Sequence, residues 1–314
     1  MQRKKAVIIF ITGLLFVCFF LYLLQPDHNQ GKVESVKAIA SNDQGKIDDT
    51  GDTTAAEEEI QAELVKENEK SITEDIKDKV REVVEGALDL FKKDLKIVSI
   101  GDSLTEGIGD ETENGGYVGI LNHTFEDNNL NITVENFGKK GNRSDQLLKR
   151  LEKEAISSAI KEADIVLITI GANDIMKVLK SNFMNVTMEP FKEERLAYIE
   201  RLRSIINKIN ELNPETQIYL IGFYNPFEQY FGEIKELDLI IDNWNEAGKS
   251  LSEEYDNMGY IPIKDLFSDT NISLLADDKF HPNTNGYKLM AKRVLEYLKE
   301  SNEETEITTV EIET

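Results

Sequence analysis

A serine, a histidine and an aspartate in this chain have the types and spacing that nucleophilic catalysis requires. Ser103 directly follows an apolar, strand-like run that ends in Gly101-Asp102. A serine hydroxyl is a poor nucleophile until a general base removes its proton. Histidine suits that task because it titrates near neutrality. Ser103 is therefore either a nucleophile held at the end of a strand or simply a helix cap.

The choice of base is narrow because the chain has three histidines. His28 lies just past an apolar N-terminal run, and His123 falls inside a helical pattern. His281 lies in a loop, followed by Pro282, and Asp278 precedes it by three residues. A carboxylate at that spacing could curl round to the imidazole and fix its tautomer. The alternative is a loop or capping histidine with no catalytic role.

Ester cleavage also needs hydrogen-bond donors for the developing oxyanion. The candidates are the backbone N–H groups of Ser103 and Gly141 and the side-chain amide of Asn173. Each has a structural interpretation as well. Ser103 and Asn173 can cap helices, and Gly141 can permit a turn.

Alternating strands and helices must position these residues. The expected strands are residues 95–100, 131–137, 164–170, 216–222 and 259–263. The expected helices are residues 117–127, 144–161, 190–212, 236–257 and 284–300. Such alternation predicts an α/β domain with a parallel sheet covered by helices on both faces.

Four polar clusters follow the expected strands at 101–104, 136–144, 171–174 and 276–283. In an open parallel sheet, ligands bind beyond the carboxyl ends of the strands. We therefore expect the four clusters to converge on one crevice. Structural interpretations of the single residues leave this shared placement unexplained.

The clusters resemble the four sequence blocks of the SGNH (GDSL) hydrolase family. The matching motifs are "GDSL" at 101–104, "N-x-x-x-x-G" at 136–141, "G-x-N-D" at 171–174 and "D-x-x-H-P" at 278–282. They occur in the family's order, and the resemblance covers about residues 95–300. It implies a flavodoxin-like three-layer sandwich with a five-stranded parallel sheet, and catalysis without metal or cofactor.

By this resemblance, Ser103 is the nucleophile, His281 the base and Asp278 its orienting partner. The Ser103 N–H, the Gly141 N–H and the Asn173 side chain form the oxyanion hole. The family's spacing favours Gly141 over the nearby Gly138.

The family's three-residue spacing from aspartate to histidine favours Asp278 over its neighbour Asp277. Asp102 and Asp174 are expected to organise the site through hydrogen bonds with the backbone.

The rest of the chain divides into segments of distinct composition. Residues 1–24 combine basic residues with a nineteen-residue uncharged run, long enough for a membrane anchor, with a cleaved signal peptide as the alternative. Residues 25–94 form an acidic tether with an amphipathic helix at about 57–93. The hydrolase domain covers 95–300, and 301–314 form an acidic tail.

Charge and cysteine content exclude several classes of function. With 36 basic and 59 acidic residues, the net charge of −23 argues against a nucleic-acid partner. The single cysteine, Cys18, excludes an intramolecular disulfide and zinc sites built from cysteine clusters. Basic residues before the apolar run favour a catalytic domain outside the cytoplasm, retained at the membrane or secreted if residues 1–24 are cleaved.

Three hypotheses for function remain. The first is an extracytoplasmic serine esterase or lipase acting on lipids or small acyl esters. The second is a carbohydrate O-acetylesterase acting on cell-wall polymers, and the third a non-catalytic module that binds an acylated ligand.

The stretch 222–234 carries five aromatic residues that either wall the crevice or belong to the core. They are Phe223, Tyr224, Phe227, Tyr230 and Phe231.

Overall fold

Five parallel strands form the centre of the domain. The computed structural model describes residues 94–312 except 183, 185, 228–233 and 269–272. Within this part the strands are β1 (Leu95–Gly101), β2 (Ile132–Gly138), β3 (Ile165–Thr169), β4 (Gln217–Ile221) and β5 (Met258–Ile261). Their order is β2-β1-β3-β4-β5, with every pair parallel. This is the flavodoxin-like order, so the predicted α/β class and five-stranded parallel sheet are confirmed.

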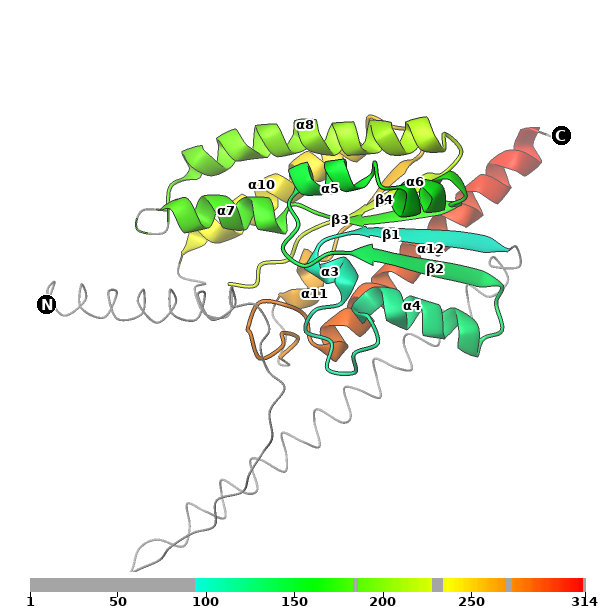
Figure 1. The fold of residues 1–314 in the computed structure, drawn as a ribbon, viewed down its shortest axis with the longest axis horizontal. Coiled ribbons are helices and arrows are strands. Elements are labelled where there is room, and N and C mark those ends of the chain that lie inside the picture. The colour runs from blue at the N-terminus through cyan, green and yellow to red at the C-terminus, as the bar shows by residue number, and fades with distance from the viewer. Residues whose placement is uncertain (1–93, 183, 185, 228–233, 269–272, 313–314) are drawn as a thin grey trace, which may run out of the picture. The chain divides into compact units, whose positions relative to one another are not determined.

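Helices cover both faces of the sheet (Figure 1). One face carries α4 (Gly116–Asp127) and α12 (Thr284–Ile312). The other carries α5 (Ser144–Arg150), α6 (Glu154–Lys161), α7 (Ala172–Asn182), α8 (Met188–Leu212) and α10 (Lys235–Ser252). The short helices α3 (Ser103–Glu106) and α11 (Lys264–Phe267) follow β1 and β5.

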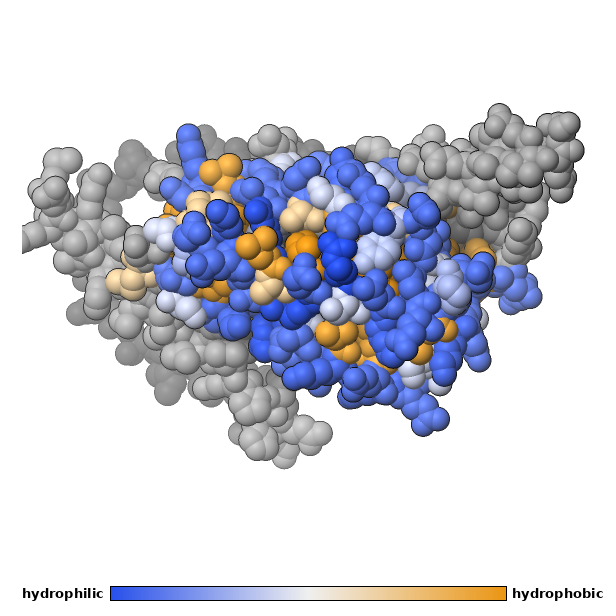
Figure 2. Space-filling model, turned by 90° about the horizontal axis from the view of Figure 1, so that it is seen from above, coloured by the Kyte–Doolittle hydropathy of each residue, from blue (hydrophilic) through white to orange (hydrophobic). Residues whose placement is uncertain are grey.

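The strands are apolar because both of their faces are buried. Ile97 and Leu167 belong to a hydrophobic cluster with residues of α4 and α12. On the opposite side, Tyr198 of α8 and Trp244 of α10 stack with ring centroids 4.8 Å apart. Near-continuous apolar runs are typical of parallel strands for this reason. Figure 2 shows that the outer surface of the α8 side is mostly hydrophilic, with apolar residues in separate patches.

The single helix expected at 144–161 is two helices, α5 and α6. The break at residues 151–153 changes the phase of the apolar stripe. Leu147 and Leu151 are buried before and at the break, and Ile156 and Ile160 are buried after it. One continuous helix would not turn all four toward the sheet, because its faces repeat every three to four residues.

Helix α10, expected at 236–257, ends at Ser252, and two further helical features differ from the expectation. Helix α7 was not expected, and it begins directly after the third polar cluster. Helix α12 was expected to end at residue 300 but continues to Ile312, so most of the predicted acidic tail has a helical backbone.

The predicted anchor at 1–24 and the tether with its helix at about 57–93 lie outside the described residues. Within the described part of the chain, none of the helices combines the length and apolar character that crossing a membrane requires.

Candidate active site

A sharp turn from β1 into α3 presents Ser103. Gly101 lies so close to β3 that a Cβ on it would be 2.3 Å from the Thr169 carbonyl oxygen, so a larger residue would force the strands apart. Asp102 caps α3, and its Oδ1 accepts a hydrogen bond from the Leu104 N–H at 3.1 Å. Ser103 therefore opens the helix at the carboxyl edge of the sheet and is 6% exposed.

The Asp102 carboxyl is buried beside the serine. Its burial raises its pKa to about 7, against the lowering effect of hydrogen bonds from the Leu104 N–H and the Thr169 hydroxyl. The Thr169 hydroxyl also contacts Thr105 Oγ1 at 2.6 Å, which in turn lies 3.3 Å from the Tyr117 hydroxyl. A chain of buried polar groups thus joins β1, α3, β3 and α4. As expected, Asp102 acts on the backbone, and it also bonds a side chain.

A short hairpin-like loop presents His281. Leu275 pairs with Pro282 in an antiparallel bridge, and the Ala276 N–H donates to the His281 carbonyl at 2.8 Å. Asp278 closes the tip of the loop, because its Oδ1 accepts from the N–H groups of Phe280 at 3.0 Å and His281 at 2.9 Å. These local bonds set the direction in which the His281 ring leaves the backbone.

Ser103, His281 and Asp278 come together in one relay. His281 Nε2 lies 2.9 Å from Ser103 Oγ, and His281 Nδ1 lies 2.5 Å from Asp278 Oδ2. The serine and histidine are 178 residues apart in sequence. Of the other histidines, His123 is exposed on α4, and His28 lies outside the described residues.

The contacts distinguish Asp278 from Asp277, which is exposed on the same loop. Burial raises the pKa of the Asp278 carboxyl, but the hydrogen bond and charge of His281 outweigh it and leave this pKa below its ordinary value. A carboxylate held ionised in this way fixes the tautomer of the imidazole and stabilises the imidazolium that forms when a proton is taken up.

The expected oxyanion donors lie on the neighbouring loops. The Asn173 side-chain Nδ2 donates to the Asn142 carbonyl at 3.0 Å, which links the loop after β2 to the start of α7. A primary amide has two N–H bonds, so one remains for a ligand. Gly141 adopts φ +74°, a left-handed conformation that favours glycine, and its Cα faces open space.

The competing glycine, Gly138, has a packing role. A Cβ on Gly138 would lie 2.1 Å from the Glu106 backbone nitrogen, so β2 could not approach α3 if this residue were larger. Asn136 bonds the same region, donating from Nδ2 to the Thr105 carbonyl at 2.7 Å and accepting from the Gly138 N–H at 2.8 Å. The two glycines of the second block therefore differ, with Gly138 packed and Gly141 open.

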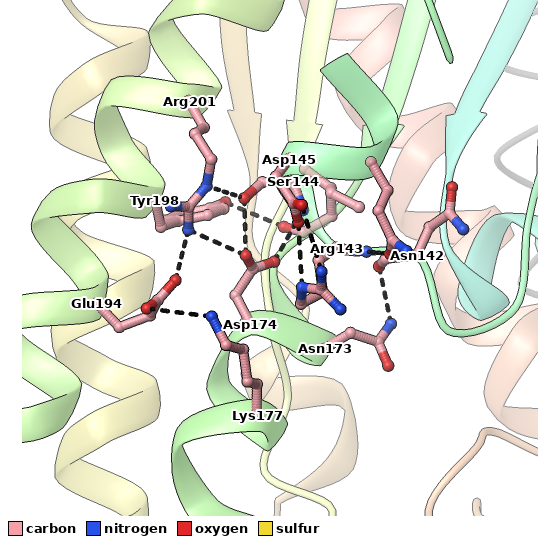
Figure 3. A network of polar contacts seen from close by, with 12 residues as sticks. Asn142, Arg143, Ser144, Asp145, Asn173, Asp174, Lys177, Glu194, Tyr198 and Arg201 are labelled. Atoms are coloured by element: carbon pink, nitrogen blue, oxygen red, sulfur yellow. Dashed lines mark hydrogen bonds and ion pairs between the residues drawn. The ribbon is translucent and has the colours of Figure 1, made fainter. Parts of the chain in front are cut away.

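A charged network behind Asn173 was not expected in this form (Figure 3). The Asp174 carboxylate accepts hydrogen bonds from the Ser144 N–H at 2.9 Å and the Ser144 hydroxyl at 2.8 Å. Arg201 of α8 donates to the same carboxylate at 3.1 Å, to Ser144 Oγ at 2.6 Å and to Glu194 at 2.6 Å. Lys177 lies 3.9 Å from Glu194 at the outer end of the network.

This network ties the second polar cluster to the third. Burial raises the pKa of the Asp174 carboxyl, although the Ser144 hydrogen bonds and the Arg201 charge act against it. The sequence contained one signal for Arg201. Arg201 is a charged residue on a stripe of α8 whose other members, Tyr198, Leu202 and Ile205, are buried.

Asp110 is a further buried acid, and the sequence pattern did not point to it. Its carboxylate accepts from Thr112, from the Gly116 N–H at 3.1 Å and from the Thr284 hydroxyl at 2.8 Å. These bonds hold the glycine-rich loop after α3 against the start of α12, three residues beyond His281. Although burial raises the pKa of the Asp110 carboxyl, these donors lower it below its ordinary value.

The aromatic stretch after β4 divides into core and rim. Phe223 and Tyr224 are both 7% exposed, which supports their interpretation as core residues. Phe227 is only partly buried, and its ring lies 6.1 Å from that of Phe280. Phe280 meets the His281 ring edge-on at 5.1 Å, so this aromatic pair borders the His281 imidazole.

The remaining two aromatics, Tyr230 and Phe231, lie outside the described residues. Within the described residues, His, Cys, Asp and Glu side chains form no group of three or more that could hold a metal ion.

Comparison with known proteins agrees with this geometry. The sequence model of the GDSL-like lipase/acylhydrolase family matches residues 99–289, well over half of the 314 residues. The chain belongs to this family. The predicted SGNH resemblance is thereby confirmed, and the protein is an ester-cleaving hydrolase.

Two bacterial relatives cover most of the domain. The uncharacterized protein YpmR of Bacillus subtilis is 38% identical over 212 residues, which are 66% of this chain and 83% of YpmR. The spore germination lipase LipC of Bacillus licheniformis is 26% identical over 205 residues, which are 64% of this chain and 94% of LipC.

Solved structures of esterases share the fold of this GDSL family member. The lipase Lip_vut3 from a goat rumen metagenome matches with a TM-score of 0.57 and 26% identity, covering 64% of this chain and 95% of the lipase. A catalytic mutant of Axe2, an acetylxylan esterase from Geobacillus stearothermophilus, matches with a TM-score of 0.50 and 25% identity, covering 64% and 93%.

Proposed function

We propose that this protein is an extracytoplasmic serine acylhydrolase of the esterase or lipase type, which cleaves carboxylic esters through an acyl-serine intermediate. The observation that carries the proposal is the relay from Ser103 Oγ to His281 Nε2 at 2.9 Å and from His281 Nδ1 to Asp278 Oδ2 at 2.5 Å. Hydroxyl, imidazole and carboxylate in this order are the functional core of serine hydrolases on unrelated folds.

In the first half of the reaction, Ser103 Oγ attacks the ester carbonyl carbon while His281 Nε2 takes the hydroxyl proton. The carbonyl electrons move onto oxygen, and the oxyanion accepts hydrogen bonds from the N–H groups of Ser103 and Gly141 and from the Asn173 amide. Such donors stabilise the transition state more than the ground state. Collapse of this intermediate breaks the ester C–O bond, and His281 returns the proton to the departing alcohol.

In the second half, water replaces the alcohol. His281 removes a proton from the water, whose oxygen attacks the acyl carbon of the acyl-serine. The same donors hold the second oxyanion, and its collapse releases the carboxylic acid while the proton returns to Ser103 Oγ. Asp278 stabilises the imidazolium at both stages and retains its negative charge.

The surroundings of His281 favour an apolar acyl group. Phe280 packs edge-on against the imidazole, and Phe227 packs against Phe280, so an apolar surface borders the base. The lipases LipC and Lip_vut3 are among the similar proteins. A carbohydrate O-acetylesterase acting on cell-wall polymers is the second candidate, favoured by the similarity to the acetylxylan esterase Axe2.

The proposed location rests on the sequence of residues 1–24. A basic start followed by an uncharged apolar run would keep the catalytic domain outside the cytoplasm, attached to the membrane. N-terminal sequencing of the protein recovered from membranes and from the medium tests this proposal. A mature chain that starts near Gln25 and is found in the medium would replace the anchor with a cleaved signal peptide.

A fluorophosphonate probe tests the nucleophile. The probe should label Ser103 in the wild type, and Ser103→Ala should lose labelling together with turnover of p-nitrophenyl butyrate, by at least about 10⁴-fold. The matched control is Ser158→Ala, an exposed serine on α6, which should keep full activity. A Ser103→Ala variant that keeps its turnover would refute the mechanism, and a wild type without labelling or turnover would favour the non-catalytic binding module.

A chain-length series tests the substrate. We expect p-nitrophenyl esters of four to eight carbons, roughly, to be cleaved with a higher kcat/KM than the acetate, because each buried CH₂ contributes about 0.8 kcal/mol. Acetylated xylan and O-acetylated peptidoglycan are assayed beside them. Preference for acetyl groups on these polymers would overturn the lipase-type proposal in favour of the carbohydrate esterase.

A further inference from the structure

Arg150, the last residue of α5, makes three hydrogen bonds at the carboxyl edge of the sheet. Its Nη1 donates to the Gly101 carbonyl at 3.2 Å and to Asn142 Oδ1 at 2.9 Å. Its Nη2 donates to the Phe137 carbonyl at 2.6 Å. The planar guanidinium has donors in a fixed fork, a geometry that a lysine ammonium cannot reproduce.

Two of these acceptors mark the ends of neighbouring strands. Gly101 ends β1, two residues before Ser103, and Phe137 lies one residue before the end of β2, opposite Ile100. The Gly101 carbonyl also accepts from the Lys139 N–H at 3.1 Å. Arg150 therefore fixes the strand that leads to the nucleophile relative to the strand that leads to the second polar cluster.

The third acceptor connects Arg150 to the oxyanion donors. Asn142 is 5% exposed, and its groups bond in three directions. Its side chain accepts from Arg150, its N–H donates to the Lys139 carbonyl at 3.1 Å, and its carbonyl accepts from the Asn173 amide at 3.0 Å. Because Asn142 directly follows Gly141, a shift of Asn142 would move the Gly141 N–H and release the Asn173 amide together.

We propose that Arg150 is the positioning residue of the oxyanion hole, acting through Asn142 on Gly141 and Asn173 without touching the substrate. This inference rests on the proposed function. Oxyanion donors act mainly in the transition state, so their misplacement lowers kcat and leaves KM nearly unchanged. A displacement of catalytic groups by about 1 Å can cost roughly 100-fold in rate.

The test compares Arg150→Met and Arg150→Lys with a matched control. Arg203→Met removes an arginine of α8 whose ion pair with exposed Glu254 lies away from the site. Both Arg150 variants should lose roughly 10-fold to 100-fold in kcat on p-nitrophenyl butyrate with KM changed less than about threefold. Arg203→Met should match the wild type. Unchanged kcat in both Arg150 variants, with lowered Tm alone, would reduce Arg150 to a brace of the fold.

A double-mutant cycle separates a positioning role from a purely structural one, because it measures whether the kcat losses of Arg150 and Asn173 variants are coupled. Asn173→Ala alone should cost on the order of 10²–10³ in kcat. If Arg150 acts through the same oxyanion contact, adding Arg150→Met should cost much less than it does in the wild type. Losses that multiply in full would overturn the proposal.

Asn142→Ala keeps the test decisive if Arg150→Met does not fold. It removes the acceptor of Arg150 but retains both strand carbonyls and the Asn142 carbonyl that holds Asn173. We expect a loss in kcat of the same size as in Arg150→Lys, with a smaller decrease in Tm. Wild-type kcat in this variant would refute the connection. If the wild type itself neither turns over esters nor reacts with fluorophosphonate, the proposed function fails instead.

Discussion

The proposed nucleophile side and the proposed base side of the site are held in different ways. Ser103, Gly141 and Asn173 follow three adjacent strands, β1, β2 and β3, and long-range contacts of Arg150 and Arg201 join their loops. His281 lies instead on one short loop whose bonds are mostly internal, from Ala276 to Pro282.

The difference reflects what each side is proposed to do, oxyanion stabilisation on one side and proton transfer on the other. Oxyanion stabilisation depends on dipoles fixed before the reaction, and buried charged networks provide such rigidity. The base side depends on local contacts, because Asp278 lies on the same loop as His281 and bonds both its N–H and its ring.

The largest effect should come from the internal pair of the base side. Asp278→Asn retains an acceptor for the N–H groups of Phe280 and His281 but favours the wrong imidazole tautomer. We expect kcat on p-nitrophenyl butyrate to fall by about 10⁴-fold with little loss of Tm. Asp277→Asn is the matched control and should keep wild-type activity. A loss in Asp277→Asn equal to that in Asp278→Asn would contradict this assignment of the orienting carboxylate.

An intermediate effect should appear on the nucleophile side as a pH dependence of stability. The folded pKa of Asp102 is about 7 against an ordinary 3.8, so between these values the folded state binds more protons than the unfolded state. Stability contributed by this group therefore decreases as pH rises through this window. Asp102→Asn imitates the protonated carboxyl and should raise stability at pH 8 relative to the wild type by a few kcal/mol, roughly.

Melting curves of the wild type and Asp102→Asn, recorded from about pH 5 to about pH 8, measure how steeply the stability depends on pH. Asp256→Asn, which changes an exposed aspartate, serves as the control and should keep the wild-type slope. Equal slopes in Asp102→Asn and the wild type would mean that Asp102 is ionised throughout the window.

The smallest effect concerns one of the contacts that join the base loop to the rest of the domain. Tyr224 donates to the Phe280 carbonyl at 2.6 Å while its ring stacks on Phe267 at 4.0 Å. Tyr224→Phe removes only the hydrogen bond and should cost about 1 kcal/mol, or roughly 2–4 °C in Tm. We expect kcat to change by less than about tenfold, since the Asp278–His281 pair stays intact.

Tyr255→Phe is the comparison for this change. It removes a hydrogen bond from Tyr255 to Asn207 on an exposed surface away from the catalytic loop. It should lower Tm less than Tyr224→Phe and leave kcat unchanged. A larger kcat loss in Tyr224→Phe than in Asp278→Asn would mean that the Tyr224 hydrogen bond, rather than the Asp278 carboxylate, orients His281.

Much of the fold and of the site could be predicted from the spacing of residues along the chain. Alternating apolar runs predicted the five parallel strands, because buried strands and amphipathic helices have different periods. The polar clusters predicted a common crevice, since the carboxyl ends of parallel strands share one edge. The Asp278–His281 pairing is equally local, because three residues are enough to form the turn that joins them.

Other features depended on contacts between distant segments, which spacing does not encode. Arg150 reaches Gly101 across 49 positions, Arg201 reaches Ser144 across 57, and Asp110 reaches Thr284 across 174. The break between α5 and α6 likewise follows from which residues the sheet buries. By itself, the sequence determined the strands, the polar clusters at their ends and the local acid–base pair. Only the tertiary structure decided which charged side chains hold those clusters in register, because such contacts form when helices fold back over the sheet.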